Sequence, residues 1–142
     1  MTESTAVAPS LVIERNFPHP PQKLWRALTE SPLIAQWLMA NDFAPAVGHK
    51  FQFRREPVAG WNGIIDCEVL VVEAGSRLAY TWETMGQQFK IDFTLAPSAD
   101  GTSLRMEQSG FQPDQHQAYN GAKYGWQGFL GALDRITGEI SA

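Results

Sequence analysis

The last part of the chain constrains the fold most, because residues 113–140 have the pattern of one long amphipathic helix. Apolar residues recur there at alternating steps of three and four, which places side chains on one helix face. That face comprises Tyr119, Ala122, Trp126, Phe129, Leu133, Ile136 and Ile140. Asp134 falls on the opposite, polar face. Pro113 and Asp114 suit a helix start, since proline fits the first turn and a carboxylate favours the positive end of the helix dipole.

A line of small residues runs beside this apolar face. Its members are Ala118, Gly121, Gly125, Gly128 and Ala132. Each glycine costs a helix roughly 0.5–1 kcal/mol relative to alanine, so the line needs an explanation. We expect close approach of the helix to a neighbouring backbone. The alternative is that bulky side chains are left out so that a space remains beneath the helix.

The residues ahead of this helix predict strands, with a pair of short helices after the first one. The first strand is expected at 11–17, where alternation by two places Arg15 inward with its apolar neighbours. The short helices are expected at 21–29 and up to Trp37, and Ser31-Pro32 has the pattern of a cap followed by a first-turn proline. Further strands are expected from residue 50 onward and at 64–73, 77–84, 88–95 and 102–109, with Asp100-Gly101 as a hairpin turn.

Short turns predict antiparallel pairing, and alternation gives the sheet one apolar and one charged face. Only the C-terminal helix is long enough to cover the apolar face. The sequence therefore predicts an α+β fold, a curved antiparallel sheet of about six strands wrapped around one long helix, with the short helices closing an end. Residues 1–10 are expected to be a disordered tail, and 11–142 a single domain.

Composition and charge exclude several classes of function. The net charge of −4, without a run of Lys or Arg, argues against a nucleic-acid or anionic-membrane surface. The single cysteine, Cys67, excludes an intramolecular disulfide and offers no metal cluster. No apolar run is long enough to span a bilayer, and the first ten residues carry no basic residue, unlike a secretory signal. A cytoplasmic location is the default expectation.

Six segments together resemble a known family. They are ERNFPHPPQKLWRALTE from Glu14, IAQWL ending at Leu38, VGHKFQF from Val47, RLAYTWE from Arg77, GTSLRMEQSGF from Gly101 and YGWQGFLGALDRI from Tyr124. In this order they resemble the family named after the activator of Hsp90 ATPase, in its short single-domain bacterial form, within the START-like (SRPBCC) superfamily. The resemblance covers nearly the whole chain after residue 10. It implies the helix-grip fold, with a cavity between sheet and helix that is often used for apolar ligands. It does not imply one activity, because the superfamily includes ligand carriers, cyclases, self-sacrifice resistance proteins and chaperone partners.

Few residues suggest catalysis. The three histidines are dispersed, and no His-Glu-x-x-His, Walker or Gly-x-Ser-x-Gly motif is present. Asp66 and Glu68 share a strand face, but we expect that face to be the wet one. Cys67 is expected to be a small buried hydrophobe. A cyclase-type enzyme would need an inward acid–base pair, for which Tyr80 with Arg15 is the one candidate. An inward Arg15 would need an anionic ligand group or a protein carboxylate, unless it reaches solvent.

The function that we expect is non-catalytic binding of a small hydrophobic or aromatic molecule in that cavity, without metal or cofactor. The expected lining consists of Arg15, Trp37, Phe53, Ile65, Cys67, Tyr80, Trp82, Phe93, Met106, Gln108, Tyr119, Ala122, Trp126 and Phe129. The alternative is a protein-interaction module acting on a chaperone, and an enzyme is the least favoured of the three. An uncovered edge strand could also support a homodimer.

Overall fold

The computed structural model describes residues 9–140, so most of the expected tail lies outside the described residues. Its last residue, Ser10, does not belong to a tail, because it opens the first strand. The elements are β1 (Ser10–Phe17), α1 (Pro21–Thr29), α2 (Ser31–Trp37), β2 (Ala40–Asn41), β3 (Lys50–Arg54), β4 (Ile64–Glu73), β5 (Arg77–Thr84), β6 (Gln87–Ser98), β7 (Gly101–Ser109) and α3 (His116–Gly138).

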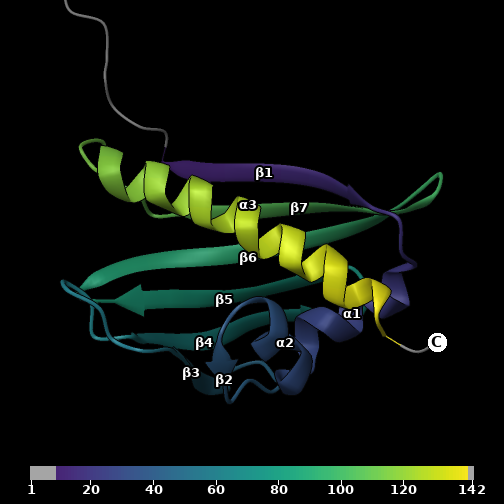
Figure 1. The fold of residues 1–142 in the computed structure, drawn as a ribbon, viewed down its shortest axis with the longest axis horizontal. Coiled ribbons are helices and arrows are strands. Elements are labelled where there is room, and N and C mark those ends of the chain that lie inside the picture. Colours follow the sequence, from purple (N-terminus) through teal and green to yellow (C-terminus); the bar gives the residue numbers. More distant parts are fainter. Residues whose placement is uncertain (1–8, 141–142) are drawn as a thin grey trace, which may run out of the picture.

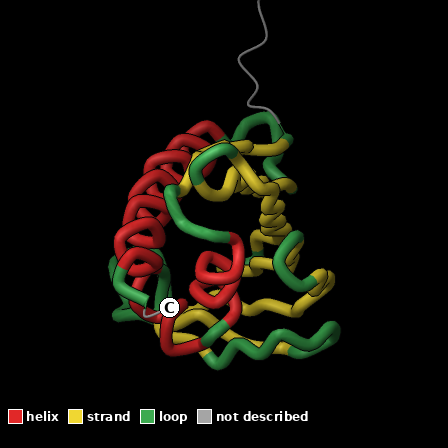
Figure 2. The backbone as a smooth tube through the Cα atoms, turned by 90° about the vertical axis from the view of Figure 1, so that its right-hand side faces the viewer, coloured by secondary structure: helices red, strands yellow, loops and turns green. Residues whose placement is uncertain are grey.

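The strands form one antiparallel sheet in the order β1-β7-β6-β5-β4-β3-β2. It has seven strands rather than about six, because the two-residue β2 pairs with β3. Helix α3 lies across one face of this sheet, with α1 and α2 beside its C-terminal end (Figure 1). Figure 2 shows the result from the side, with helices forming one layer and strands the other. The α+β helix-grip architecture expected from the sequence is confirmed.

Local chemistry explains the short helices. Helix α1 has proline in its first turn, and the Pro20 carbonyl accepts hydrogen bonds from the amides of Lys23 and Leu24. Glu30 has extended backbone angles and separates α1 from α2. The expectation that Ser31 caps α2 is wrong, because Ser31 is already helical and its hydroxyl donates to the Asn41 carbonyl at 3.0 Å. That bond ties the start of α2 to the edge strand β2.

Two hairpin turns show different uses of glycine. Between β5 and β6, Met85 (φ 52°) and Gly86 (φ 79°) both have positive φ, as a type I′ turn requires. The turn between β6 and β7 is displaced from the expected Asp100-Gly101, because Gly101 pairs with Ser98 inside the sheet. A Cβ at Gly101 would clash with the carbonyl oxygen of Phe17. Close backbone approach therefore explains this glycine.

Helix α3 is shorter than the sequence pattern, and its burial is unequal along its length. All its buried residues lie from the middle of the helix onward: Trp126, Leu130, Leu133, Ile136 and Thr137. Tyr119, Ala122 and Phe129, which the helical pattern placed on the core face, are only partly buried. The C-terminal half packs against α1 and α2, whereas the N-terminal half is more exposed. This difference leaves room for a groove beside the middle of the helix.

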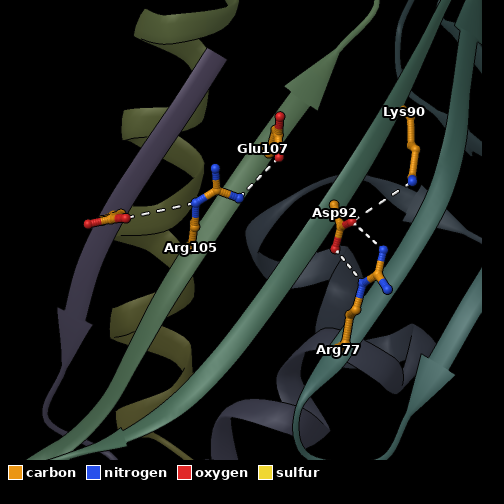
Figure 3. A network of polar contacts seen from close by, with 6 residues as sticks. Arg77, Lys90, Asp92, Arg105 and Glu107 are labelled. Atoms are coloured by element: carbon orange, nitrogen blue, oxygen red, sulfur yellow. Dashed lines mark hydrogen bonds and ion pairs between the residues drawn. The ribbon is translucent and has the colours of Figure 1, made fainter. Parts of the chain in front are cut away.

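The outer face of the sheet carries ion pairs, as alternation predicted (Figure 3). Arg77 holds Asp92 through two hydrogen bonds of 2.8 and 3.2 Å, and Arg105 donates to Glu107 at 3.0 Å. Asp66 is exposed and accepts a hydrogen bond from Gln52 at 2.7 Å, so it belongs to this wet face. No helix within residues 9–140 is long and apolar enough to cross a membrane.

A candidate ligand site under helix α3

Five aromatic side chains on the inner face form a closed loop of ring contacts. The loop runs Tyr80–Phe53–Trp82–Trp126–Phe93 and back to Tyr80. The centroid distances lie between 5.4 and 6.1 Å, within the range of favourable aromatic pairs. We call these residues the five-aromatic cluster. Because β3, β5, β6 and α3 all contribute, the cluster sits where the helix meets the centre of the sheet.

Sheet register and one buried hydrogen bond position this cluster. Period-two alternation along β5 sends both Tyr80 and Trp82 to the inner face. From the helix, the Trp126 indole nitrogen donates to Oε1 of Gln108 on β7 at 2.7 Å, and both residues are buried. This bond fixes the orientation of the Trp126 ring and ties α3 to β7. The rings of the cluster therefore have fixed positions relative to the sheet.

The interior around the cluster disfavours charge. Desolvation raises the pKa of the Tyr80 phenol well above its ordinary value, with a smaller contribution from Cys67. Burial, followed by the nearby Asp66 carboxylate, also raises the pKa of the Cys67 thiol. Both groups remain protonated at neutral pH. Cys67 thus lacks the thiolate character that a nucleophile needs.

A surface groove opens beside the middle of α3. Its volume is about 550 Å³, and it is lined by Arg55, Tyr124, Gly125, Gln127, Gly128 and Phe129. The groove joins the helix to the residue that follows β3, and Tyr124 stands at it with 82% of its surface exposed. The Phe129 ring lies 5.6 Å from that of Trp126, so the groove borders the five-aromatic cluster. A binding site that includes both would combine an aromatic wall with access from solvent.

The glycines of α3 have a different role from the one expected. A Cβ at Gly121 or Gly128 would meet nothing within 4 Å outside the local helix backbone, and one at Gly125 would lie at 3.9 Å from the Phe129 ring. Close approach to a neighbouring backbone is therefore wrong for these three positions. The alternative of open space fits better, although the space lies beside the helix at the surface rather than beneath it.

The structure separates Arg15 from the other expected lining residues. Its guanidinium donates to Asp134 at 3.1 Å, and the same carboxylate lies 2.7 Å from Nε2 of His19. The protein carboxylate thus takes the place of an anionic ligand. Asp134 therefore faces Arg15 and His19, and its expected position on the polar face of the helix is wrong. Among residues 9–140 no hydrogen bond or ion pair joins Arg15 to Tyr80, so the acid–base pair considered for a cyclase is not assembled.

The remaining expected residues surround the cluster at different depths. Trp37 contacts Phe93 with a centroid distance of 6.3 Å, and its indole donates to the Ala27 carbonyl. Ile65, Cys67 and Met106 are buried in the sheet. Tyr119 contacts Phe111 at 5.1 Å rather than a ring of the five-aromatic cluster, and Ala122 is partly buried.

Sequence reasoning missed several residues at this site. Phe43 and Phe51 both contact Tyr80, with centroid distances of 6.3 and 5.4 Å. Alternation with Phe53 could have identified Phe51, whereas Phe43 lies in a loop without periodicity. Arg55 and Tyr124 could not be found from periodicity either, because they line the groove from the exposed side. In the described part of the chain no three His, Cys, Asp or Glu side chains gather as a metal site would require.

Comparison with known structures agrees with this architecture. Protein MLL2253 from Mesorhizobium loti is 47% identical, with a TM-score of 0.86 over 94% of this chain and 99% of its own. Protein BH1534 from Bacillus halodurans is 25% identical, with a TM-score of 0.79 over 93% and 99% of the two chains. DynU16, described as a putative protein in the dynemicin biosynthetic locus, is 24% identical and shares the fold, with a TM-score of 0.79. The match covers 91% of this chain and 47% of DynU16. No curated protein matches the chain.

The fold and the aromatic inner face define a helix-grip protein of the START-like class. The family model described as "Activator of Hsp90 ATPase homolog 1-like protein" matches residues 18–138. The chain therefore belongs to this family, and the resemblance seen in the sequence is confirmed.

Proposed function

We propose that the protein binds a small apolar or aromatic molecule at the five-aromatic cluster, without catalysing a reaction on it. The observation that carries this proposal is the closed loop of five aromatic rings that borders an open groove on α3. A groove volume of about 550 Å³ falls within the range typical of small-molecule sites. Aromatic side chains supply such a site with large contact area and ordered geometry.

The groove is the proposed entrance. Gly125 and Gly128 have no side chains to fill the groove on its α3 side. Phe129 lines the groove and contacts Trp126 of the cluster. A ligand that enters there first meets exposed residues, because Tyr124, Gln127 and Gly128 are all exposed. In this account the cost of the glycines to helix stability is offset by access to the aromatic wall.

The entrance is tested with Gly128→Leu, using the neutral fluorescent probe N-phenyl-1-naphthylamine. We expect saturable probe binding to wild type, and an affinity at least about tenfold weaker in the variant because its side chain fills the groove. The control is Gly121→Leu, which makes the same change on the same helix outside the groove, where a Cβ also meets open space. That control should bind as wild type does.

Thermal unfolding of all three proteins separates loss of binding from loss of structure, and bound probe should raise the melting temperature by mass action. Equal affinities of the two leucine variants for the probe would contradict the proposal that the groove is the entrance. Failure of the probe and of a mixed panel of apolar and aromatic compounds to bind wild type would contradict the proposed function itself.

A second candidate function is a protein-interaction module acting on a chaperone. The family's description supports it, and the highly exposed Tyr124 on α3 is a side chain of the type enriched in protein interfaces. This function requires the surface of α3 but not the buried rings. Tyr124→Ala should abolish association with an Hsp90-type chaperone in this account, whereas small-molecule binding needs Trp82 and Trp126.

A further inference from the structure

Three polar groups on the inner face have no hydrogen-bond partner among residues 9–140. They are the Tyr80 hydroxyl, the Trp82 indole nitrogen and the Nε2 amide nitrogen of Gln108, whose residues are only 3%, 8% and 4% exposed. Other buried polar groups nearby are satisfied, since the Trp37 indole donates to Ala27 and the Trp126 indole to Gln108. Hydrogen-bonding groups at this depth normally find partners.

These three polar atoms are not completely covered by packed carbon. Throughout the described residues, every fully buried side-chain nitrogen or oxygen has a partner. The three unpartnered atoms must therefore keep some accessible surface, although their residues are more than nine-tenths buried. A ligand atom that reaches this remaining surface would satisfy them.

The three groups border the same cluster. Tyr80 and Trp82 are neighbours on the inner face of β5 and belong to the cluster. Gln108 lies in the same row of the sheet as Tyr80, because both pair with Ile91 from opposite sides. Trp126 connects them further, as it is hydrogen-bonded to Gln108 and its ring centroid lies 5.6 Å from that of Trp82.

Their chemistry determines what a ligand must carry. An indole N–H and an amide NH₂ can only donate, and a phenol O–H can donate as well. The amide oxygen of Gln108 is already used by Trp126. The indole and amide groups are donors only, whereas the phenol both donates and accepts, so a ligand that satisfies all three must bring an acceptor.

The acceptor should be neutral. Arg15 lies away from the cluster, partly exposed and held by Asp134, and Arg55 lines the groove from its exposed side. The raised pKa values of Tyr80 and Cys67 show that the interior penalises a negative charge. A carboxylate placed there would lose its hydration without gaining a counter-ion.

We propose that the ligand of this site is a neutral aromatic ketone, whose carbonyl oxygen accepts a hydrogen bond from the Tyr80 hydroxyl while its rings stack within the five-aromatic cluster. Trp82 and Gln108 supply further donors at the same wall. This inference rests on the proposed function, because it names the ligand class of the same site. It goes further by assigning Tyr80 as the residue that sets specificity.

Matched ligand series test this proposal by isothermal titration on the full chain. Each series shares one aromatic frame: 2-ethylnaphthalene, 2-acetylnaphthalene and 2-naphthoate, with the equivalent compounds built on benzene and on fluorene. We expect the ketone to bind most tightly within at least one frame, and the carboxylate most weakly. In Tyr80→Phe, which removes only the hydroxyl, the ketone should lose about three- to tenfold in affinity, and the ethyl compound less than about twofold.

Tyr119→Phe is the matched control, because it deletes the same atom from a tyrosine that contacts Phe111 outside the cluster. It should keep the wild-type preference. A hydrocarbon or carboxylate that binds as tightly as the ketone in every frame, or a ketone preference that survives in Tyr80→Phe, would overturn this inference while the proposed function stands. If no compound of any series binds wild type, both fall. The wild-type comparison decides the matter even if Tyr80→Phe does not fold.

Discussion

At the scale of single residues, the buried polar groups of the inner face differ in whether they form hydrogen bonds. Within residues 9–140, the indoles of Trp37 and Trp126 are hydrogen-bonded, whereas the polar atoms of Tyr80 and Trp82 have no partner. Arg15 shows the opposite outcome, because the inward cation suggested by alternation is held by Asp134. The candidate site thus offers neutral hydrogen-bond donors, whereas the charged groups Arg15 and Asp134 pair with each other outside it.

One residue outside the site is in an unfavourable conformation. Met85 has φ 52°, a region that costs an L-residue without a locally bonding side chain roughly 1–2 kcal/mol. Asparagine tolerates this region in type I′ turns. Met85→Asn should therefore stabilise the protein by about 0.5–1 kcal/mol in urea unfolding. Met85→Leu keeps the steric problem and should change stability by less than about 0.5 kcal/mol. If the leucine variant gains as much as the asparagine one, turn geometry is not the cause.

At the scale of elements, periodicity predicts well where one face is uniformly buried. The bounds of β4, β5 and α1 agree with the expected ones, because turn residues and prolines delimit clear patterns. Helix α3 was less predictable. Its register against β1 and α1 brings Asp134 to Arg15 and His19, a contact across more than a hundred residues that a helical pattern cannot contain. The two-residue β2 has too few positions for any period.

Glycine substitutions distinguish the close approach at β7 from the open flank of α3. Gly101→Ala should destabilise the protein by at least about 2 kcal/mol, because the added Cβ would clash with the Phe17 carbonyl and crowd the His19 amide, 2.8 Å away. Gly121→Ala should instead stabilise it by about 0.5–1 kcal/mol, since the Cβ enters open space and alanine favours the helix. Chemical denaturation measures both. A loss of stability in Gly121→Ala would mean that α3 has a neighbour at this position.

At the scale of the whole molecule, the sheet and α3 form two layers, and the N-terminal half of the helix is the less buried one. The α+β class follows from the sequence because the sheet has one apolar face and only one element long enough to cover it. The candidate site follows only in part. Alternation identifies Tyr80, Trp82 and Phe53 as inward, but their closed loop with Trp126 depends on how α3 crosses the strands. The groove at Gly128 depends on the same crossing.

The central claim, that a ligand occupies the five-aromatic cluster, is tested most directly through the five tryptophan indole signals in a ¹⁵N–¹H spectrum of the full chain. On addition of 2-acetylnaphthalene, we predict saturable shifts of the Trp82 and Trp126 signals. Those of Trp25 and of Trp61, which is hydrogen-bonded to Thr84 outside the cluster, should stay in place. Shifts confined to Trp25 or Trp61, or no saturable shift at any indole, would contradict the account.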